Sequence, residues 1–461
     1  MKHSFFGGLH PDDMKRLTDH KATETAPAPA QVIIPMSMHT GAPCKPTVSA
    51  GDRVLMGQRI GSSETALSAP IHASVSGTVV AVEPRLHPNG TKVLSVVIRN
   101  DGKDEKDPAY APRDPDLQPS GEEILAAIRD RGIAGTGSTA LPAYFKLSTA
   151  VGKADVLILD DAECEPYITS DSRTMIDYPH EVVGGIELLM EALGLQTAVF
   201  SIEENKKEAI AAIRQALSGR ETGITVLPMP FRYPEGSEKQ LIDAISRALP
   251  PGIMPAGASC VVLHTFTAYG VYRAVWEGFP AIERIVTVSG SAVREPKNLR
   301  VRVGTPIRDL FAACGGFDGR PFKILMGGPM RGAAQYSLDV PVIKGSNAVL
   351  AFSGGETPPE NPSACIRCGR CVDICPMHLM PLFMYQCEEK DDYEGMKRLR
   401  LASCVECGLC TYVCPGKLHL TQSFQTGKAK LIAKAAADRE REKAIKAREA
   451  APPVPAVRTL R

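Results

Sequence analysis

Eight cysteines fall in two short runs in the last quarter of the 461-residue chain. The first run, CIRCGRCVDICP, occupies residues 365–376, and the second, CVECGLCTYVCP, occupies residues 404–415. Both runs separate their cysteines by two, two and three residues, and both end in proline. Cysteine thiolates are the soft ligands that zinc ions and iron–sulfur clusters prefer, so this clustering indicates bound metal.

The spacing C-x₂-C-x₂-C-x₃-C-P is the pattern of bacterial ferredoxins. In that pattern the first three cysteines bind three corners of one [4Fe–4S] cluster, and the fourth binds the neighbouring cluster. We therefore assign one cluster to Cys365, Cys368, Cys371 and Cys414, and the other to Cys404, Cys407, Cys410 and Cys375. Gly369 and Gly408 are expected to keep side-chain bulk away and to leave backbone N–H groups free to bond the sulfurs.

Structural zinc is the alternative, because four thiolates also suit one tetrahedral zinc ion. Zinc sites usually pair two C-x₂-C knuckles across a longer gap and need neither a third cysteine nor a Cys-Pro ending. Since the ferredoxin pattern occurs twice in full, we favour clusters. His378 and His419 fit no ligand spacing, so packing or surface roles are expected for both.

The composition describes a folded protein of several domains. Apolar residues make up 44% of the chain and charged residues 23%, and the length exceeds what one core supports. A net charge of +1 and an aromatic content of 5% favour no nucleic-acid partner. We find no apolar run of about eighteen residues and no secretory signal, so a cytoplasmic location is expected, free or docked.

The chain divides by pattern. Residues 31–100 alternate apolar and polar residues between glycines, which is typical of short strands and turns. From residue 122 strands alternate with helices, as in an α/β domain, and the strand expected at 283–290 closes that series. Within it, Asn205 is expected to cap the helix that follows the strand at 197–204. Residues 427–449 are rich in charge and predict an exposed helix.

Several stretches together resemble one family, the C subunit of Rnf-type electron-transport complexes. They are GGLHP (7–11), GAP (41–43), HASVSGTV (72–79), AECEPYIT (162–169), YPEGSEKQLI (233–242), VTVSG (286–290), GGPMRG (327–332) and the two cysteine runs. The resemblance covers nearly the whole chain in order. It implies a peripheral subunit on the cytoplasmic face of the membrane. Its partners would be the other subunits of a complex that couples electron flow between NADH and ferredoxin to ion translocation.

The expected fold class is multidomain α/β and α+β. Its segments are an N-terminal barrel-sandwich hybrid (1–100), a linker (101–121), an α/β domain (122–296), a β-grasp module (297–355), a helical dicluster domain (356–426) and a charged helix with a disordered tail (427–461). The first segment resembles biotinyl and lipoyl carriers, but PIHASVSG lacks their modified lysine, so no swinging arm is expected. The α/β domain resembles the flavin- and NADH-binding subunit of respiratory complex I, which implies FMN as the converter between two-electron and one-electron carriers.

By that resemblance, the residues expected at the cofactor are Gly135, Gly137, Lys146, Glu163, Glu165 and Lys239. No catalytic residue is assigned. The glycine loop departs from the family pattern over residues 138–141, Asp160 and Asp161 replace Asn-Gly, and His264 stands at or near a family asparagine. A carboxylate added beside a phosphate is repulsive.

Two alternatives therefore stay open beside the oxidoreductase subunit with two clusters and FMN. One is a soluble reductase of the flavin or cobalamin type. The other is an iron–sulfur relay without flavin, in which the α/β domain serves only as a scaffold.

Overall fold

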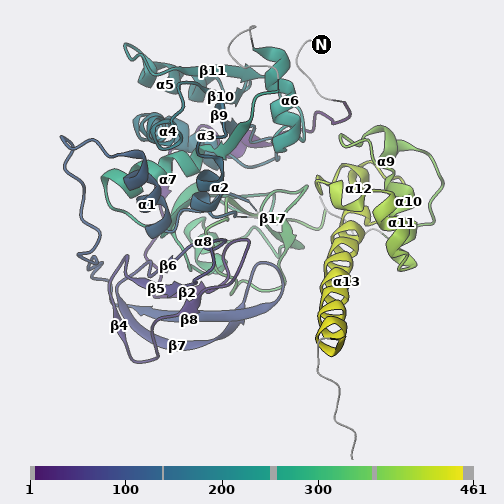
Figure 1. Ribbon diagram of the computed structural model, residues 1–461, viewed down its shortest axis with the longest axis horizontal. Coiled ribbons are helices and arrows are strands. Elements are labelled where there is room, and N and C mark those ends of the chain that lie inside the picture. The colour runs from purple at the N-terminus through teal and green to yellow at the C-terminus, as the bar shows by residue number, and fades with distance from the viewer. Residues whose placement is uncertain (1–5, 138–139, 250–256, 356–360, 450–461) are drawn as a thin grey trace, which may run out of the picture. The chain divides into compact units, whose positions relative to one another are not determined.

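The computed structural model describes residues 6–137, 140–249, 257–355 and 361–449 of the chain (Figure 1). The chain forms two compact units, residues 1–359 and 360–461. The tail predicted to be disordered, 450–461, lies outside the described residues, as do loop positions 138 and 139. Within the described ranges, no helix combines the length and apolar character needed to cross a membrane.

The predicted small β-domain is present at the start of the first unit. A four-stranded antiparallel sheet has the order β2-β8-β7-β4 and a three-stranded sheet the order β3-β5-β6. Alternate residues of β2 and β8 enter a shared core, and Val32, Ile34, Val96 and Ile98 are fully buried there. The strands are β2 (Gln31–Pro35), β3 (Lys45–Pro46), β4 (Arg53–Val54), β5 (Arg59–Ser62), β6 (Ile71–His72), β7 (Gly77–Leu86) and β8 (Lys92–Asn100).

The α/β domain contains a parallel sheet of order β11-β10-β9-β12 with helices on both faces (Figure 1). Leu157 and Leu159 of β9 face a core with α1, α4, α5 and α7, whereas Val156 and Ile158 face α6. The strands are β9 (Val156–Asp161), β10 (Ala198–Glu203), β11 (Ile224–Met229) and β12 (Cys260–His264). The helices are α1 (Gly121–Asp130), α2 (Ala143–Ala150), α3 (Ser170–Asp177), α4 (Pro179–Leu193), α5 (Lys207–Leu217), α6 (Glu238–Ala248) and α7 (Thr265–Trp276).

The predicted cap of α5 is wrong. Lys206, not Asn205, occupies the N-cap position, and no side chain caps the helix. The Asn205 amide instead donates to Asp13 Oδ2 at 3.4 Å. Lys206 is buried, and its ammonium donates a hydrogen bond to Asp161. This pairing places Lys206 at the N-cap position, where the preference of helices for a capping side chain predicts Asn205.

The strand predicted at 283–290 belongs to a different sheet from the one expected. β13 (Glu283–Ser289) pairs antiparallel with β14 (Lys297–Arg302) in a mixed sheet of order β1-β14-β13-β17-β15-β16. The two strands are joined by a short connection, and a close antiparallel partner explains why β13 leaves the parallel sheet. The remaining elements are η1 (Lys15–Leu17), β1 (Glu24–Thr25), α8 (Ile307–Ala313), β15 (Lys323–Met326), β16 (Ala333–Ala334) and β17 (Ala348–Phe352).

The second unit is helical and packs around the cysteine runs. Its core contains Met384, Leu401, Leu420 and Phe424. The predicted exposed helix is present, but it begins at Leu420 because its first turns enter this core. The elements are α9 (Arg370–Asp373), α10 (Pro381–Glu389), α11 (Tyr393–Arg398), η2 (Leu401–Ser403), α12 (Leu409–Tyr412) and α13 (Leu420–Glu449).

Candidate functional site

Two cavities in the second unit are each lined by four of the clustered cysteines. One is lined by Cys365, Cys368, Cys371 and Cys414, and the other by Cys404, Cys407, Cys410 and Cys375. Each cavity therefore combines three thiols of one run with the fourth thiol of the other, as crossed ligation requires. No group of three or more Cys, His, Asp or Glu residues in the described ranges could hold a single metal ion. Thiols spread around a cavity suit a multi-iron cluster better than one tetrahedral ion.

The backbone of each run donates to sulfur in the same way. Arg367 and Glu406 have left-handed φ values of 55° and 54°, and their N–H groups lie 3.4 Å from the Sγ atoms of Cys365 and Cys404. Such hydrogen bonds tune the potential of an iron–sulfur cluster. Gly369 is required by its φ of 79° and not by crowding, because an added Cβ would find no atom closer than 4.0 Å.

Charged side chains gather in the first unit, where three parallel strands end. Asp160 and Asp161 end β9, Glu203 ends β10 and His264 ends β12. The carboxyl ends of neighbouring parallel strands meet at one edge of the sheet, where α/β proteins bind ligands. His264 Nδ1 lies 3.7 Å from Asp160 Oδ2, and burial raises the pKa of Asp160.

Two buried lysines hold this edge together. Lys206 Nζ lies 3.1 Å from Asp161 Oδ2, 3.2 Å from Glu163 Oε2 and 3.9 Å from Glu203 Oε2. Lys15, from the N-terminal segment, donates to the carbonyl oxygen of Glu163 at 2.6 Å. The added Asp161 carboxylate is therefore paired with a cation inside the protein, which offsets much of the repulsion expected from the sequence.

The glycine loop lies between α1 and α2. Gly135 N–H donates to Leu141 O at 2.9 Å, and Gly137, with a φ of 86°, donates to Gly345 O at 2.9 Å. Lys146 on α2 donates to Val262 O at 2.7 Å and forms an ion pair of 3.0 Å with Glu238 Oε2. The loop is thus fixed to the segment of Gly345, and the helix that follows it is fixed to β12 through Lys146.

Four family models match successive parts of the chain. They are described as the RnfC barrel sandwich hybrid domain (residues 3–103), the Nuo51 FMN-binding domain (128–273), the SLBB domain (285–334) and the 4Fe-4S dicluster domain (357–415).

The relatives agree with these models. The chain is 42% identical over 399 residues to the C subunit of the proton-translocating ferredoxin:NAD(+) oxidoreductase complex of Clostridium ljungdahlii, covering 86% of this chain and 87% of that protein. It is 39% identical over 436 residues to the C subunit of the Na(+)-translocating ferredoxin:NAD(+) oxidoreductase complex of Acetobacterium woodii, covering 94% and 98%. The chain belongs to the RnfC family. Both the predicted family and the predicted fold class are confirmed.

The C subunit of the ion-translocating oxidoreductase complex of Rhodobacter capsulatus is 42% identical over 438 residues, covering 93% of this chain and 83% of that protein. Among solved structures, an NAD⁺-reducing [NiFe]-hydrogenase matches 68% of this chain and 61% of its own at 17% identity and a TM-score of 0.46, too remote a likeness to inform the site.

In this RnfC protein, the flavin residues predicted from the sequence fall into three places. Gly135, Gly137 and Lys146 lie together on the loop and the following helix. Glu163 joins the buried charged edge, where it accepts a hydrogen bond from Asp171 N–H at 2.8 Å. Glu165 is turned toward the β-grasp module instead, and Lys239 is exposed on α6, with no side-chain partner in the described part of the chain.

Glu165 links two of the RnfC motifs directly. Its Oε2 accepts a hydrogen bond from Met330 N–H at 3.0 Å, and a Cβ at Gly328 would lie 2.2 Å from the same oxygen. The stretches AECEPYIT and GGPMRG therefore meet through this carboxylate, and only a glycine allows the approach. Glu238, the partner of Lys146, was missed at the sequence level, although it stands beside Lys239 in the stretch YPEGSEKQLI.

The buried edge fits the polar part of a flavin. Within the described residues, Glu165 Oε1, Asp171 Oδ1 and both carboxylate oxygens of Glu203 are buried and accept no hydrogen bond. Buried acceptors normally have donors, and the O–H and N–H groups of a ribityl chain and flavin ring are donors. The phosphate end needs cations or backbone N–H groups. Lys146 carries a cation, but the N–H groups of Gly135 and Gly137 already donate to Leu141 O and Gly345 O, so these glycines can only let a phosphate approach the loop closely.

We expect the Glu165→Gln variant to change how stability depends on pH. Burial raises the pKa of Glu165 from its ordinary 4.5 to about 7. Protonated Glu165 therefore stabilises the folded protein fully below pH 4.5, and this stabilisation is lost as the pH rises to 7. The loss amounts to at most about 3 kcal/mol. Gln mimics the neutral acid, so the variant should have a larger free energy of unfolding than the parent at pH 8 and a similar one near pH 4.5.

Urea unfolding followed by the fluorescence of Trp276, the single tryptophan, measures this difference. The exposed Glu122→Gln variant is the matched control and should follow the parent at both pH values. An equal offset for Glu165→Gln at both pH values would show that the Glu165 proton does not stabilise the fold.

Proposed function

We propose that this chain is the peripheral electron-transfer subunit of a membrane-bound, ion-translocating ferredoxin:NAD⁺ oxidoreductase complex, with two [4Fe–4S] clusters and FMN. The observation that carries the proposal is the pair of cavities, each lined by three cysteines of one run and the fourth of the other. The names of the relatives support the reaction and the presence of partner subunits. None of the thirteen cysteines, all of them described, forms a disulfide, which supports a reducing compartment and hence the cytoplasmic face.

The roles of the side chains follow from their positions. We assign the two sets of four cysteines as cluster ligands, in the crossed arrangement. Gly135, Gly137 and Lys146 are assigned to the phosphate end of FMN, and Glu163 and Glu165 to its polar groups. Lys239, exposed on α6, can meet only a ligand that approaches from solvent. Bound FMN would accept two electrons from NADH and release them singly.

The test is to purify the full chain without oxygen and to measure iron, acid-labile sulfide and the FMN released by acid. We expect about eight iron atoms and one FMN per chain, and bleaching of the visible absorption by NADH. Absence of iron and sulfide would overturn the proposal. Clusters without FMN would instead favour the relay without flavin.

The loops of the two cysteine runs have the same backbone conformation at their left-handed residues, but their exposed side chains differ. In the first loop, Ile366 is 68% exposed, and Arg367 and Arg370 are exposed, with no side-chain partner among the described residues. At the corresponding places of the second loop, Glu406 is paired with Lys428 of α13 at 2.5 Å, and Leu409 is fully buried.

The first loop therefore suits contact with another protein, whereas α13 covers the second. An exposed apolar residue followed by two exposed arginines, neither of them paired with a described residue, is a surface that an acidic protein recognises. We propose that the cluster of Cys365, Cys368, Cys371 and Cys414 exchanges electrons with an acidic one-electron carrier or subunit.

The double variant Arg367→Glu/Arg370→Glu should slow electron transfer from the dithionite-reduced chain to an acidic [4Fe–4S] ferredoxin by about tenfold or more at low ionic strength. The same variant should speed transfer to the basic carrier cytochrome c, and both effects should shrink in high salt. Stopped-flow absorbance measures both rates.

The control Lys397→Glu/Arg398→Glu makes the same charge change on exposed residues of α11 and should alter the ferredoxin rate by less than about twofold. Unchanged ferredoxin transfer with slowed reduction of the clusters by NADH would mean that the loop faces the first unit of its own chain, and would refute the docking proposal.

A further inference from the structure

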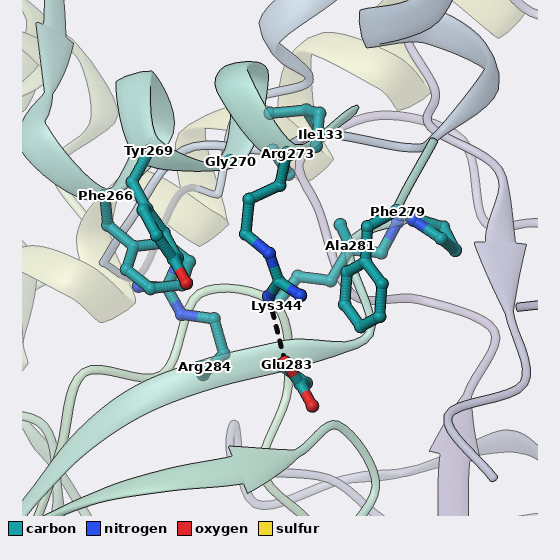
Figure 2. A pocket seen from close by; sticks show the side chains of 12 residues that line it. Ile133, Phe266, Tyr269, Gly270, Arg273, Phe279, Ala281, Glu283, Arg284 and Lys344 are labelled. Carbon is teal, nitrogen blue, oxygen red and sulfur yellow. Dashed lines mark hydrogen bonds and ion pairs between the residues drawn. The ribbon is translucent and has the colours of Figure 1, made fainter. Parts of the chain in front are cut away.

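A cavity lies between α7, the start of β13 and the segment before β17, and none of the residues assigned to the clusters or to FMN lines it (Figure 2). It encloses about 440 Å³, including the part that opens to solvent. Phe266, Tyr269 and Phe279 form aromatic walls, and three cations, Arg273, Arg284 and Lys344, face one carboxylate, Glu283. The lining thus carries an excess of positive charge.

Arg284 is a buried cation that forms no ion pair with a described carboxylate, and only Asp171 attracts it from a longer distance. Its Nε donates to Ser346 O at 3.0 Å and its Nη2 to Thr136 Oγ1 at 3.1 Å, while its Nη1 donates to no described residue. The guanidinium lies 3.8 Å from the ring centroid of Phe266. Because arginine does not lose its proton in proteins, this charge is permanent, and a buried charge that lacks an ion-pair partner is unfavourable.

Lys344, in the same cavity, is also a buried basic residue that is bonded to carbonyl oxygens and forms no ion pair with a described carboxylate. Its Nζ donates to Pro70 O and Gly132 O, both at 2.6 Å, and no carboxylate within the described residues pairs with it. Burial lowers the pKa of Lys344 to about 7. Arg273, the third cation of the cavity, differs from these two because it forms ion pairs with Glu277 and with Glu283, each at 2.9 Å. The dashed line in Figure 2 marks its contact with Glu283.

We propose that this cavity binds a small oxyanion, a phosphate or a carboxylate, between Arg284 and Lys344. Oxyanions match the planar donor fork of arginine, and the aromatic walls exclude water and strengthen the attraction. A bound anion would give Arg284 an ion-pair partner and would favour the protonated form of Lys344.

An occupied cavity would also stabilise the glycine loop of the candidate flavin site. Arg284 donates to Thr136 in that loop, and Gly345, next to Lys344, accepts from Gly137 N–H at 2.9 Å. An anion that orders Arg284 and Lys344 therefore also orders the two contacts that hold the loop, one made by Arg284 and the other by Gly345, the neighbour of Lys344. The anion site does not depend on the proposed function, because its charges and walls are present whether or not FMN binds.

The test is the thermal unfolding midpoint of the anaerobic full chain, with and without FMN, in sodium phosphate, sodium acetate and sodium chloride at equal ionic strength. A ligand that binds the folded state raises the midpoint in a saturable way. We expect that rise with phosphate or acetate and not with chloride, and the tighter of the two identifies the anion class. Isothermal titration of phosphate and of acetate gives the dissociation constants.

Gly270 on α7 gives a matched pair of variants. A Cβ there would meet Ile133 side-chain atoms at 3.6 and 3.9 Å, which are ordinary contacts, so Gly270→Ala should bind the anion as the parent does. Gly270→Leu should fill the space and abolish the anion-dependent rise. Arg284→Gln should raise the dissociation constant about tenfold or more, and Arg284→Lys should recover part of the affinity.

Three results would overturn the proposal. The first is an equal effect of chloride and the oxyanions. The second is an undiminished rise in Gly270→Leu, which remains decisive even if Arg284→Gln fails to fold. The third is competition between FMN and phosphate, which would make the cavity part of the flavin site.

Discussion

Replacing Cys414 with serine is expected to destroy the cluster held by the first cysteine run and to spare the other. Cys414 belongs to the second run in sequence but lines the cavity of Cys365, Cys368 and Cys371. A [4Fe–4S] cluster bound by three thiolates is held weakly, because serine is a harder and more basic ligand. Iron and labile sulfide should fall to about half.

The reciprocal variant distinguishes crossed from uncrossed ligation. Cys375→Ser should remove the cluster of Cys404, Cys407 and Cys410. Low-temperature electron paramagnetic resonance of the reduced protein resolves which cluster signal is lost in each variant. Loss of the same cluster in Cys414→Ser as in Cys404→Ser would mean that each run binds its own cluster.

Cys387→Ser is the matched control for both variants. This thiol lies in the same unit, contacts Asp392 Oδ2 at 3.7 Å and lines neither cavity. The control should therefore keep both clusters and the full iron content. Loss of iron here would show that any serine in the unit disturbs it, and the two cluster assignments would lose their basis.

The grouping of the cysteines could be predicted from the sequence because the relevant geometry is local. Gaps of two and three residues leave the chain few ways to present its thiols, and the left-handed residues at Arg367 and Glu406 repeat at the same place in each run. The glycine loop and its lysine were predicted by resemblance from a local pattern of the same kind, and their role at a cofactor stays a prediction. A local pattern with a fixed ligand constrains its own structure.

The buried charged edge could not be predicted in the same way. Lys15 and Lys206 are separated by almost two hundred residues, and both approach Glu163. From the sequence Asp161 is simply an added negative charge, and Lys206 an ordinary lysine at the start of a helix. Their pairing depends on three parallel strands ending together, which no local rule contains.

The same long-range packing explains the other errors. Asn205 satisfies every local requirement of a helix cap, but burial of Lys206 shifts the helix start. β13 continues the strand–helix alternation in sequence, but an adjacent antiparallel strand draws it into another sheet. The place of Glu165 beside the cofactor stays a prediction: one of its oxygens is bonded to the β-grasp module, and the other accepts no hydrogen bond from a described residue.

Lys206→Met is expected to lower the free energy of unfolding of the first unit by about 3–5 kcal/mol. Burial opposes the charge of this lysine, but the carboxylates of Asp161, Glu163 and Glu203 raise its pKa above the ordinary value. Removing the ammonium leaves those carboxylates buried with Lys15 as the nearest cation, 4.0 Å from Glu163 Oε2. Urea unfolding followed by Trp276 fluorescence measures the loss.

The neighbouring Lys207→Met is the control, because Lys207 is exposed on the first turn of the same helix and should change stability by less than about 1 kcal/mol. Adding Asp161→Asn to Lys206→Met should recover part of the loss, since one of the unpaired charges is then removed. If Lys206→Met were as stable as Lys207→Met, the carboxylates would have to be protonated in the folded protein. Their protons, and not Lys206, would then make the edge compatible with a phosphate-bearing cofactor.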